Sequence, residues 1–344
     1  MKAPRQLTAL APILTTAIAP MAWGTTYLVT TELLPADRPL LAGLLRALPA
    51  GIALAVITRS RPRGTWWFKA AVLGVLNIGG FFALLFLAAF SLPGGVAATL
   101  GSIQPLMAAA LAAALLGERM SPAVTLAGIL GVTGVGLLVL GAETRLDAVG
   151  VFAGLGGAAA MSVGVVLTKR WGRPTSLLAF TSWQLIAGGL FLLPLAWMLE
   201  GIPPAMSAAN LAGFLWLSSV GTAVAYPLWF RGIQILPVAQ VTLLGLLSPV
   251  VAAIAGWIVL GQSLSSAQFA GMAIVLSALW IAVFFHGPRK AQDPPRLQEI
   301  AAAAGRIHVP VFRDTLRVYN TNIIRAWVCN RNALTNARHD PAAV

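Results

Sequence analysis

The chain has 344 residues, of which 58% are hydrophobic and only 10% are charged, and its mean hydropathy is +0.84. Soluble domains carry roughly 25% charged residues, so most of this chain must face lipid or other buried helices. The net charge of +13 does not indicate a nucleic-acid-binding protein, because nine of the 23 lysines and arginines lie beyond Gly287 and most others lie in short loops. We therefore expect an integral membrane protein with no nucleic-acid partner.

The chain offers few residues for catalysis or metal binding. Its one cysteine, Cys329, excludes an intramolecular disulfide framework, and its three histidines lie at or beyond the end of the last apolar run. No Asp or Glu lies well inside an apolar run, and there is no P-loop motif. We expect no catalytic residue, no metal and no cofactor, and a membrane enzyme has little support.

Apolar runs long enough to cross a bilayer follow one another along the chain. At about 1.5 Å per residue, a helix of about 20 residues spans the ~30 Å hydrocarbon layer. The first run is too long for the apolar core of a typical signal peptide, so we interpret it as a membrane helix. The ten predicted spans are residues 8–29, 39–58, 67–90, 95–116, 122–140, 148–168, 176–198, 208–230, 237–260 and 266–285.

The loops between these spans differ in charge. The N-terminus and the loops on its side hold eleven lysines and arginines, whereas the loops on the other side hold only Arg38 and Arg145. Positively charged loops stay in the cytoplasm, so this bias predicts that both termini are cytoplasmic.

The chain is internally duplicated. Residues 92–121 return as residues 236–265 at an offset of 144 without a gap, and ten of the 30 positions are identical. Near the start of each half the offset is 138, which aligns Arg46 with Gln184. Five spans in each half are an odd number, so the second half enters the membrane from the opposite side. The sequence predicts an all-α fold of two inverted repeats, residues 8–140 and 148–285, an architecture typical of transporters.

Residues 287–344 are polar, basic and absent from the repeat, and we predict a cytoplasmic tail without stable structure. This tail raises an alternative function, a non-transporting membrane sensor or scaffold that acts through its basic C-terminal segment. Deletion of residues 288–344 discriminates the two, because a scaffold loses its phenotype while transport is intact.

Arg46 is the one charge clearly inside a predicted span. A charge there costs roughly 2.5–3.5 kcal/mol on insertion scales, so by default it faces water, a partner or a substrate. In a cavity it favours substrates with a carboxylate or other polar groups. The alternative is that Arg46 reaches the outer interface or pairs with Asp37, and the sequence leaves both interpretations open.

Uncharged polar and aromatic side chains inside the spans are further candidates for a substrate cavity. A buried amide needs a hydrogen-bond partner on another helix or on a substrate. Gln104 and Gln240 each precede a proline in the same span, Pro105 and Pro249, where a kink or hinge is expected. The candidates are Trp23, Tyr27, Asn77, Phe81, Gln104, Gln184, Tyr226 and Gln240.

These features resemble the EamA branch of the drug/metabolite transporter superfamily. The motifs are Trp23-Gly24-Thr25-Thr26-Tyr27, Arg46, Pro105 and Leu116-Gly117-Glu118, within residues 8–285. The resemblance implies export of small metabolites, amino acids or drugs from the bacterial inner membrane, through a central cavity between the repeats. The implied partners are a small-molecule substrate and the lipid bilayer, with a homodimer left open.

The second repeat departs from the family pattern at two places. Gln262 stands where a second Leu-Gly-Glu is expected, and Met161-Ser162 stands where the first repeat has Trp23-Gly24. A symmetric role for Glu118 is therefore not expected, and we predict that Glu118 caps or pairs at a helix end.

Overall fold

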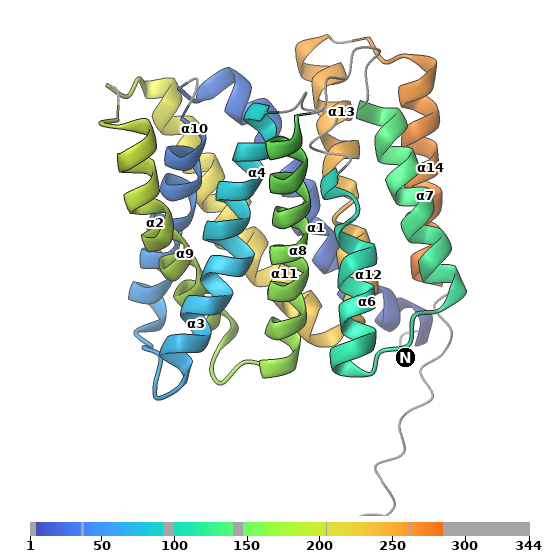
Figure 1. The fold of residues 1–344 in the computed structure, drawn as a ribbon, viewed down its shortest axis with the longest axis horizontal. Coiled ribbons are helices and arrows are strands. Elements are labelled where there is room, and N and C mark those ends of the chain that lie inside the picture. The colour runs from blue at the N-terminus through green and yellow to red at the C-terminus, as the bar shows by residue number, and fades with distance from the viewer. Residues whose placement is uncertain are drawn as a thin grey trace, which may run out of the picture. The chain divides into compact units, whose positions relative to one another are not determined.

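The computed structural model describes residues 5–35, 38–91, 100–139, 147–203, 205–261 and 263–284, and it contains only helices and turns in those ranges (Figure 1). The predicted tail at residues 287–344 lies outside them. The helices are α1 (Arg5–Leu33), α2 (Pro39–Thr58), α3 (Trp66–Gly74), η1 (Val75–Gly79), α4 (Gly80–Ser91), α6 (Gln104–Leu116), α7 (Pro122–Val139), α8 (Ala148–Trp171), α9 (Leu177–Glu200), α10 (Ala208–Ser218), η2 (Ser219–Val224), α11 (Ala225–Ile235), α12 (Val238–Leu244), α13 (Leu247–Leu260) and α14 (Ser266–Phe284).

Seven helical segments in the described ranges are long and apolar enough to cross a membrane, and two shorter apolar helices, Gln104–Leu116 and Pro122–Leu138, accompany them. The predicted all-α membrane fold is therefore confirmed. α1 is 29 residues long but is not among the seven segments, and it contains two prolines, Pro12 and Pro20. The count of ten spans and the cytoplasmic placement of the termini stay predictions.

The third predicted span of each half contains a π-helical turn. η1 joins α3 to α4 in the first half, and η2 joins α10 to α11 in the second. η2 begins 144 residues after η1, which is the offset of the sequence repeat. π-helical turns are rare and occur often at functional sites. Their recurrence at equivalent positions makes this part of both halves a candidate functional region.

The predicted span 237–260 is not one helix but two, α12 and α13. A turn at Gly245 and Leu246 separates them, with backbone hydrogen bonds from Gly245 to Thr242 and from Leu246 to Leu243, both 3.0 Å. Pro249 follows in the first turn of α13, where its missing N–H is tolerated. In the first half, a turn at Ser102 and Ile103 likewise precedes α6, and Pro105 lies in the first turn of that helix.

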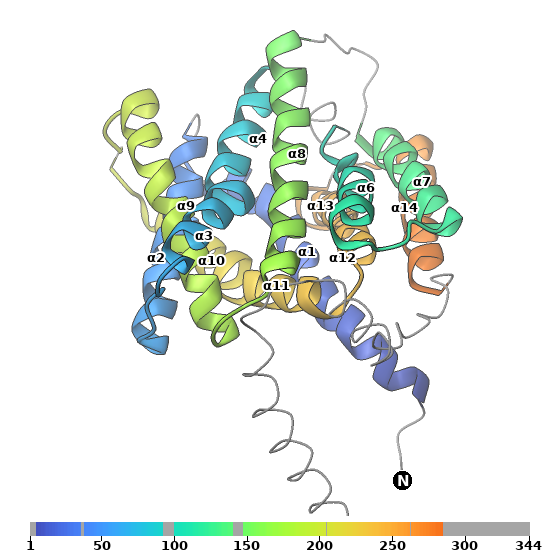
Figure 2. The ribbon, with the colours of Figure 1, turned by 60° about the horizontal axis from the view of Figure 1, so that its bottom comes forward.

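α2 and α9 pack together through reciprocal glycines, and both figures place these two helices side by side (Figures 1 and 2). A methyl group on Gly51 would lie 2.9 Å from the backbone nitrogen of Ile186, and one on Gly189 would lie 3.1 Å from Cα of Leu48. Residue numbers rise along α2 as they fall along α9, so the helices are antiparallel. The 138-residue offset relates Gly51 to Gly189 and Leu48 to Ile186, so the contact is the same when the halves are exchanged.

α7 and α14, the last described helices of the two halves, pack in the same close way (Figure 2). A methyl group on Gly134 would lie 2.9 Å from the carbonyl oxygen of Gly271, and one on Gly271 would lie 2.6 Å from that of Gly134. Only glycine allows these backbones to approach so closely.

Candidate functional site

Arg46 lies on α2 and is buried against the π-helical turn of the other half. Its Nε donates to Thr222 Oγ1 at 3.3 Å, and its Nη2 donates to the carbonyl oxygen of Gly221 at 3.1 Å. The guanidinium carbon lies 5.0 Å from the centroid of the Phe82 ring. The side chain is only 7% exposed, so it does not extend to the outer interface. Asp37, the alternative partner, lies outside the described residues.

Aromatic side chains complete this site. The indole Nε1 of Trp23 donates to the same Gly221 carbonyl at 2.9 Å. The ring of Trp23 lies 5.2 Å from the ring of Tyr226 and 5.2 Å from that of Trp229. α1 and α2 of the first half thus meet η2 and α11 of the second at one carbonyl group. We call this set the arginine cluster: Trp23, Arg46, Phe82, Gly221, Thr222, Tyr226 and Trp229.

The arginine cluster contains polar atoms without partners. Trp229 Nε1 is buried and has no hydrogen-bond partner, and neither does Thr26 Oγ1, one helical turn from Trp23 on α1. A buried polar group left unsatisfied costs about 1–3 kcal/mol, so each such atom needs an explanation. A ligand bound at the arginine cluster supplies a partner for Trp229 Nε1.

Asn77 and Gln184 form a second cluster around the other π-helical turn. Asn77 Nδ2 donates to Thr168 Oγ1 at 3.0 Å and to Gln184 Oε1 at 2.9 Å, and all three side chains are fully buried. A methyl group on Gly164 would lie 2.2 Å from Asn77 Oδ1, so this glycine makes room for the amide. We call Asn77, Thr168 and Gln184 the amide cluster. Of the two uses predicted for these amides, the structure shows hydrogen bonding between helices, while Asn77 Oδ1 and Gln184 Nε2 are buried without a partner among the described residues.

The remaining candidates are not brought together with Arg46. Gln240 Nε2 donates to the carbonyl oxygen of Ala282 on α14 at 3.4 Å, which is again a bond between helices. Gln104 Nε2 is buried without a partner in the described part of the chain, while the Gln104 carbonyl accepts from Ser162 Oγ at 3.2 Å. Phe81 is half-buried, with its ring 5.7 Å from that of Phe82. The Tyr27 side chain lies outside the described part.

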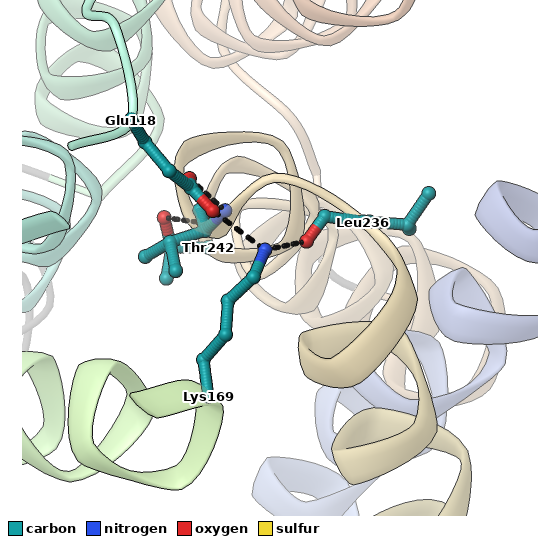
Figure 3. A network of polar contacts seen from close by, with 5 residues as sticks. Glu118, Lys169, Leu236 and Thr242 are labelled. Carbon is teal, nitrogen blue, oxygen red and sulfur yellow. Dashed lines mark hydrogen bonds and ion pairs between the residues drawn. The ribbon is translucent and has the colours of Figure 1, made fainter. Parts of the chain in front are cut away.

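A third polar group joins three helix ends (Figure 3). Glu118, just beyond the end of α6, pairs with Lys169 Nζ at 2.6 Å and accepts from the backbone N–H of Val238 at 2.8 Å. Lys169, near the end of α8, also donates to the carbonyl oxygen of Leu236. The prediction that Glu118 caps or pairs at a helix end is confirmed, although the helix it caps is α12. We call Glu118, Lys169, Leu236 and Val238 the Glu118 clasp.

Sequence reasoning missed Gly221, Thr222 and Trp229. The repeat contained a signal for the first two, because they lie 144 residues after Asn77 and Ile78. Trp229 follows Tyr226 by three residues, which places both on one face of α11. Lys169 was seen only as a loop charge, and nothing in the sequence indicates its pairing with Glu118.

Comparisons with known proteins agree with this architecture. The EamA-like transporter family matches the chain at residues 10–140 and at residues 148–284. Protein PecM of Dickeya dadantii is 45% identical over 265 residues, which cover 76% of this chain and 89% of PecM. A protein of Streptantibioticus cattleyicolor named "Probable terminal-alkyne amino-acid exporter" is 27% identical over 224 residues, which cover 64% of this chain and 75% of that protein.

A solved crystal structure shares the fold, with a TM-score of 0.69 at 20% identity over 79% of this chain and 97% of the other. The match to the family extends over both halves of the chain, and the described residues supply the apolar helices that such a protein needs. The chain belongs to the EamA-like transporter family and is a multi-pass membrane protein.

Proposed function

We propose that this protein is a secondary transporter that exports small organic solutes, such as metabolites, amino acids or drugs, across the bacterial inner membrane by alternating access. The observation that carries the proposal is the arginine cluster, where helices of both halves meet around buried polar groups without partners. A site formed between two halves opens to either side when the halves move against each other.

The pairing of the halves supports inverted repeats, and the charge bias of the loops supports placing both termini in the cytoplasm. The antiparallel contact of α2 with α9 is reciprocal, and the two π-helical turns have the offset of the repeat. The turns before Pro105 and Pro249 interrupt the fourth span of each half, and interrupted helices are common beside transporter sites. These interruptions supply the hinges in the proposed mechanism.

We assign the substrate contacts to Trp23, Arg46 and Tyr226, whereas Asn77 and Gln184 hold helices together. The proposal does not require proton coupling through a carboxylate. Among the described residues, Asp and Glu lie only at helix ends or in turns, so exchange or facilitated diffusion fits the site as well as proton antiport does.

The Glu118 clasp closes one side of the molecule in this proposal. It joins the ends of α6 and α8 to the start of α12, so all three ends are fixed together while the clasp is formed. The charge bias of the loops places these ends at the cytoplasmic face. Release of the solute from this face, or its entry there, requires the clasp to break.

The test is transport by purified protein in proteoliposomes. Efflux and counterflow are measured with labelled amino acids, aromatic acids and cationic drugs, with and without a pH gradient, and liposomes without protein are the control. We expect saturable counterflow of at least one solute class. Stimulation by the gradient identifies antiport, and indifference to it identifies exchange or facilitated diffusion. Folded protein that moves no solute in any arrangement contradicts the proposal.

A further inference from the structure

The Arg46 guanidinium is held by neutral groups and keeps one nitrogen unused. Nε donates to the Thr222 hydroxyl and Nη2 to the Gly221 carbonyl, but Nη1 has no acceptor among the residues that the structure describes. The side chain is 7% exposed, and Nη1 is not among the fully buried atoms without a partner. The site therefore presents a positive charge inside the protein, with one guanidinium nitrogen open to a further acceptor.

No described carboxylate neutralises this charge. The ion pair found within the described ranges is that of Glu118 with Lys169. The Glu200 carboxylate accepts from two backbone N–H groups of α2, the Asp147 carboxylate caps α8, and Glu32 is exposed near the end of α1. A buried charge without a counter-ion is unfavourable, so an anion that enters from outside the protein is stabilised at Arg46.

The groups beside Arg46 suit an apolar body attached to that anion. Tyr226 and Trp229 are 2% and 1% exposed, and their rings flank Trp23 at 5.2 Å each. Trp229 Nε1 is buried without a hydrogen-bond partner among the described residues. Hydrogen-bond donors next to aromatic faces are the usual lining of a site for an aromatic or apolar solute.

We propose that the transported solute is an organic anion whose carboxylate binds Arg46 and whose apolar body packs against Trp23 and Trp229. This inference rests on the proposed function, because it names the substrate class of that same site. A planar carboxylate matches the planar guanidinium, and the Tyr226 ring beside Trp23 carries a hydroxyl that can donate to it. A zwitterionic amino acid fits less well, because the described part of the site has no carboxylate to receive its ammonium group.

Binding to the purified full-length protein tests the proposal. Tryptophan fluorescence is titrated with four compounds that share a phenyl group: phenylacetate, phenylacetamide, L-phenylalanine and phenethylamine. We expect a saturable change with phenylacetate and at least about tenfold weaker binding of the other three, because charge-assisted hydrogen bonds are the strong ones. Binding of the amide as tight as that of the acid overturns the proposal, and so does the absence of saturable binding by phenylacetate.

Three variants test whether phenylacetate binds at the arginine cluster. Arg46→Gln removes the charge and is expected to weaken phenylacetate binding by about tenfold or more. Tyr226→Phe removes only a hydroxyl and is expected to weaken it by about threefold, which keeps the test valid if Arg46→Gln fails to fold. Arg231→Gln removes an exposed arginine of α11 and serves as the matched control. Unchanged phenylacetate affinity in Tyr226→Phe and in any folded Arg46→Gln protein overturns the proposal.

Transport separates a failure of this inference from a failure of the proposed function. Counterflow of neutral or cationic solutes by protein that does not recognise phenylacetate overturns the anion proposal and leaves transport standing. Protein that binds phenylacetate through Arg46 but moves no solute overturns the proposed function.

Discussion

The two π-helical turns have equivalent places in the two halves and different chemistry around them. At η1, Asn77 bonds to neutral side chains of α8 and α9. At η2, the Gly221 carbonyl accepts from Arg46 and Trp23 of the first half. The second helix of one half approaches the turn of the other half in both places, because Gln184 of α9 and Arg46 of α2 are related by the repeat offset.

This difference shows that the helix packing is repeated in both halves, whereas the polar side chains around the two turns are not. The reciprocal glycines Gly51 and Gly189 keep the same close packing of α2 against α9 in both halves. The side chains around the turns differ: η1 is bonded through the Asn77 amide, whereas η2 accepts a hydrogen bond from the Arg46 guanidinium. In the proposed transporter, a solute between the halves therefore meets a charge at η2 and none at η1 among the described residues. The asymmetry predicts that variants at the two turns have different consequences.

The largest difference is expected between Arg46→Met and Asn77→Leu. Removal of the lone buried charge should leave the free energy of unfolding unchanged or raise it by about 1 kcal/mol, because Trp23 still donates to Gly221. Transport should nevertheless fall at least about tenfold, since one charge-assisted contact contributes about 1.5–3 kcal/mol.

Asn77→Leu should act in the opposite way. It leaves the buried Gln184 amide without a partner, so the protein should lose about 1–3 kcal/mol of stability. Transport per folded molecule should change by less than about threefold. Thermal unfolding in detergent and counterflow, both normalised to folded protein, check the two variants. Equal loss of transport in both variants would remove the functional distinction between the clusters.

Alanine substitutions at the reciprocal glycines test whether the α2–α9 contact is equivalent in the two halves. Gly51→Ala and Gly189→Ala each place a methyl group under 3.0 Å from atoms of the facing helix. Overpacking of this kind costs about 1–3 kcal/mol, and the two variants should lose stability equally. Gly101→Ala is the matched control, because no atom lies within 4 Å of its added methyl group. A loss in only one of the pair contradicts the equivalence of the halves.

A smaller difference in stability is expected between alanine variants of the two glycines beside the clusters, Gly164 and Gly221. A methyl group on Gly164 lies 2.2 Å from Asn77 Oδ1, whereas one on Gly221 lies 3.5 Å from Arg46 Nη2, an ordinary contact. Gly164→Ala should therefore lower the unfolding free energy by about 1–2 kcal/mol, and Gly221→Ala by less than about 0.5 kcal/mol. Thermal melts of the two variants decide this. A larger loss in Gly221→Ala would mean that the π-helical turn itself does not tolerate a side chain.

The all-helical membrane fold and its duplication were largely predictable from sequence, because apolar runs predict membrane helices and the repeat offset indicates duplication. The two π-helical turns were not predictable, since residues 75–79 and 219–224 read as ordinary apolar helix. The break of the ninth span was placed near Pro249, but the turn lies at Gly245 and Leu246, where hydrogen bonds shift to a three-residue spacing before the proline.

The candidate site was only partly predictable for a related reason. A charge inside a span marks Arg46, and polar or aromatic side chains inside spans mark Trp23 and Tyr226. The common partner of Arg46 and Trp23 is the backbone carbonyl of Gly221, and a pattern of side chains contains no information about which carbonyl is available. The amides of Asn77 and Gln184 look equally suited to a substrate in sequence, and only their mutual distance of 2.9 Å shows that they bond each other.

The smallest effect is expected at the Glu118 clasp, which joins the two halves at one place and has no charged counterpart at the equivalent place. The repeat offsets place Gln262 opposite Glu118 and Thr31 opposite Lys169, so the equivalent pair of residues carries neither charge. Glu118→Gln makes the first half resemble the second. Glu118 and Lys169 are 23% and 15% exposed, and such partly exposed pairs contribute about 1 kcal/mol or less.

The expected result is a fall of about 1 kcal/mol or less in the unfolding free energy and a larger shift in which face of the transporter is open. A cysteine at Val238 reports this shift through its rate of labelling by a membrane-impermeant thiol reagent in right-side-out and inverted vesicles, in a Cys329→Ser background. Faster labelling in Glu118→Gln from one face only supports a clasp that closes that face. Unchanged labelling from both faces would show that Glu118 caps α12 without controlling access. The difference between the halves would then affect solute binding at Arg46 and not the opening of one face.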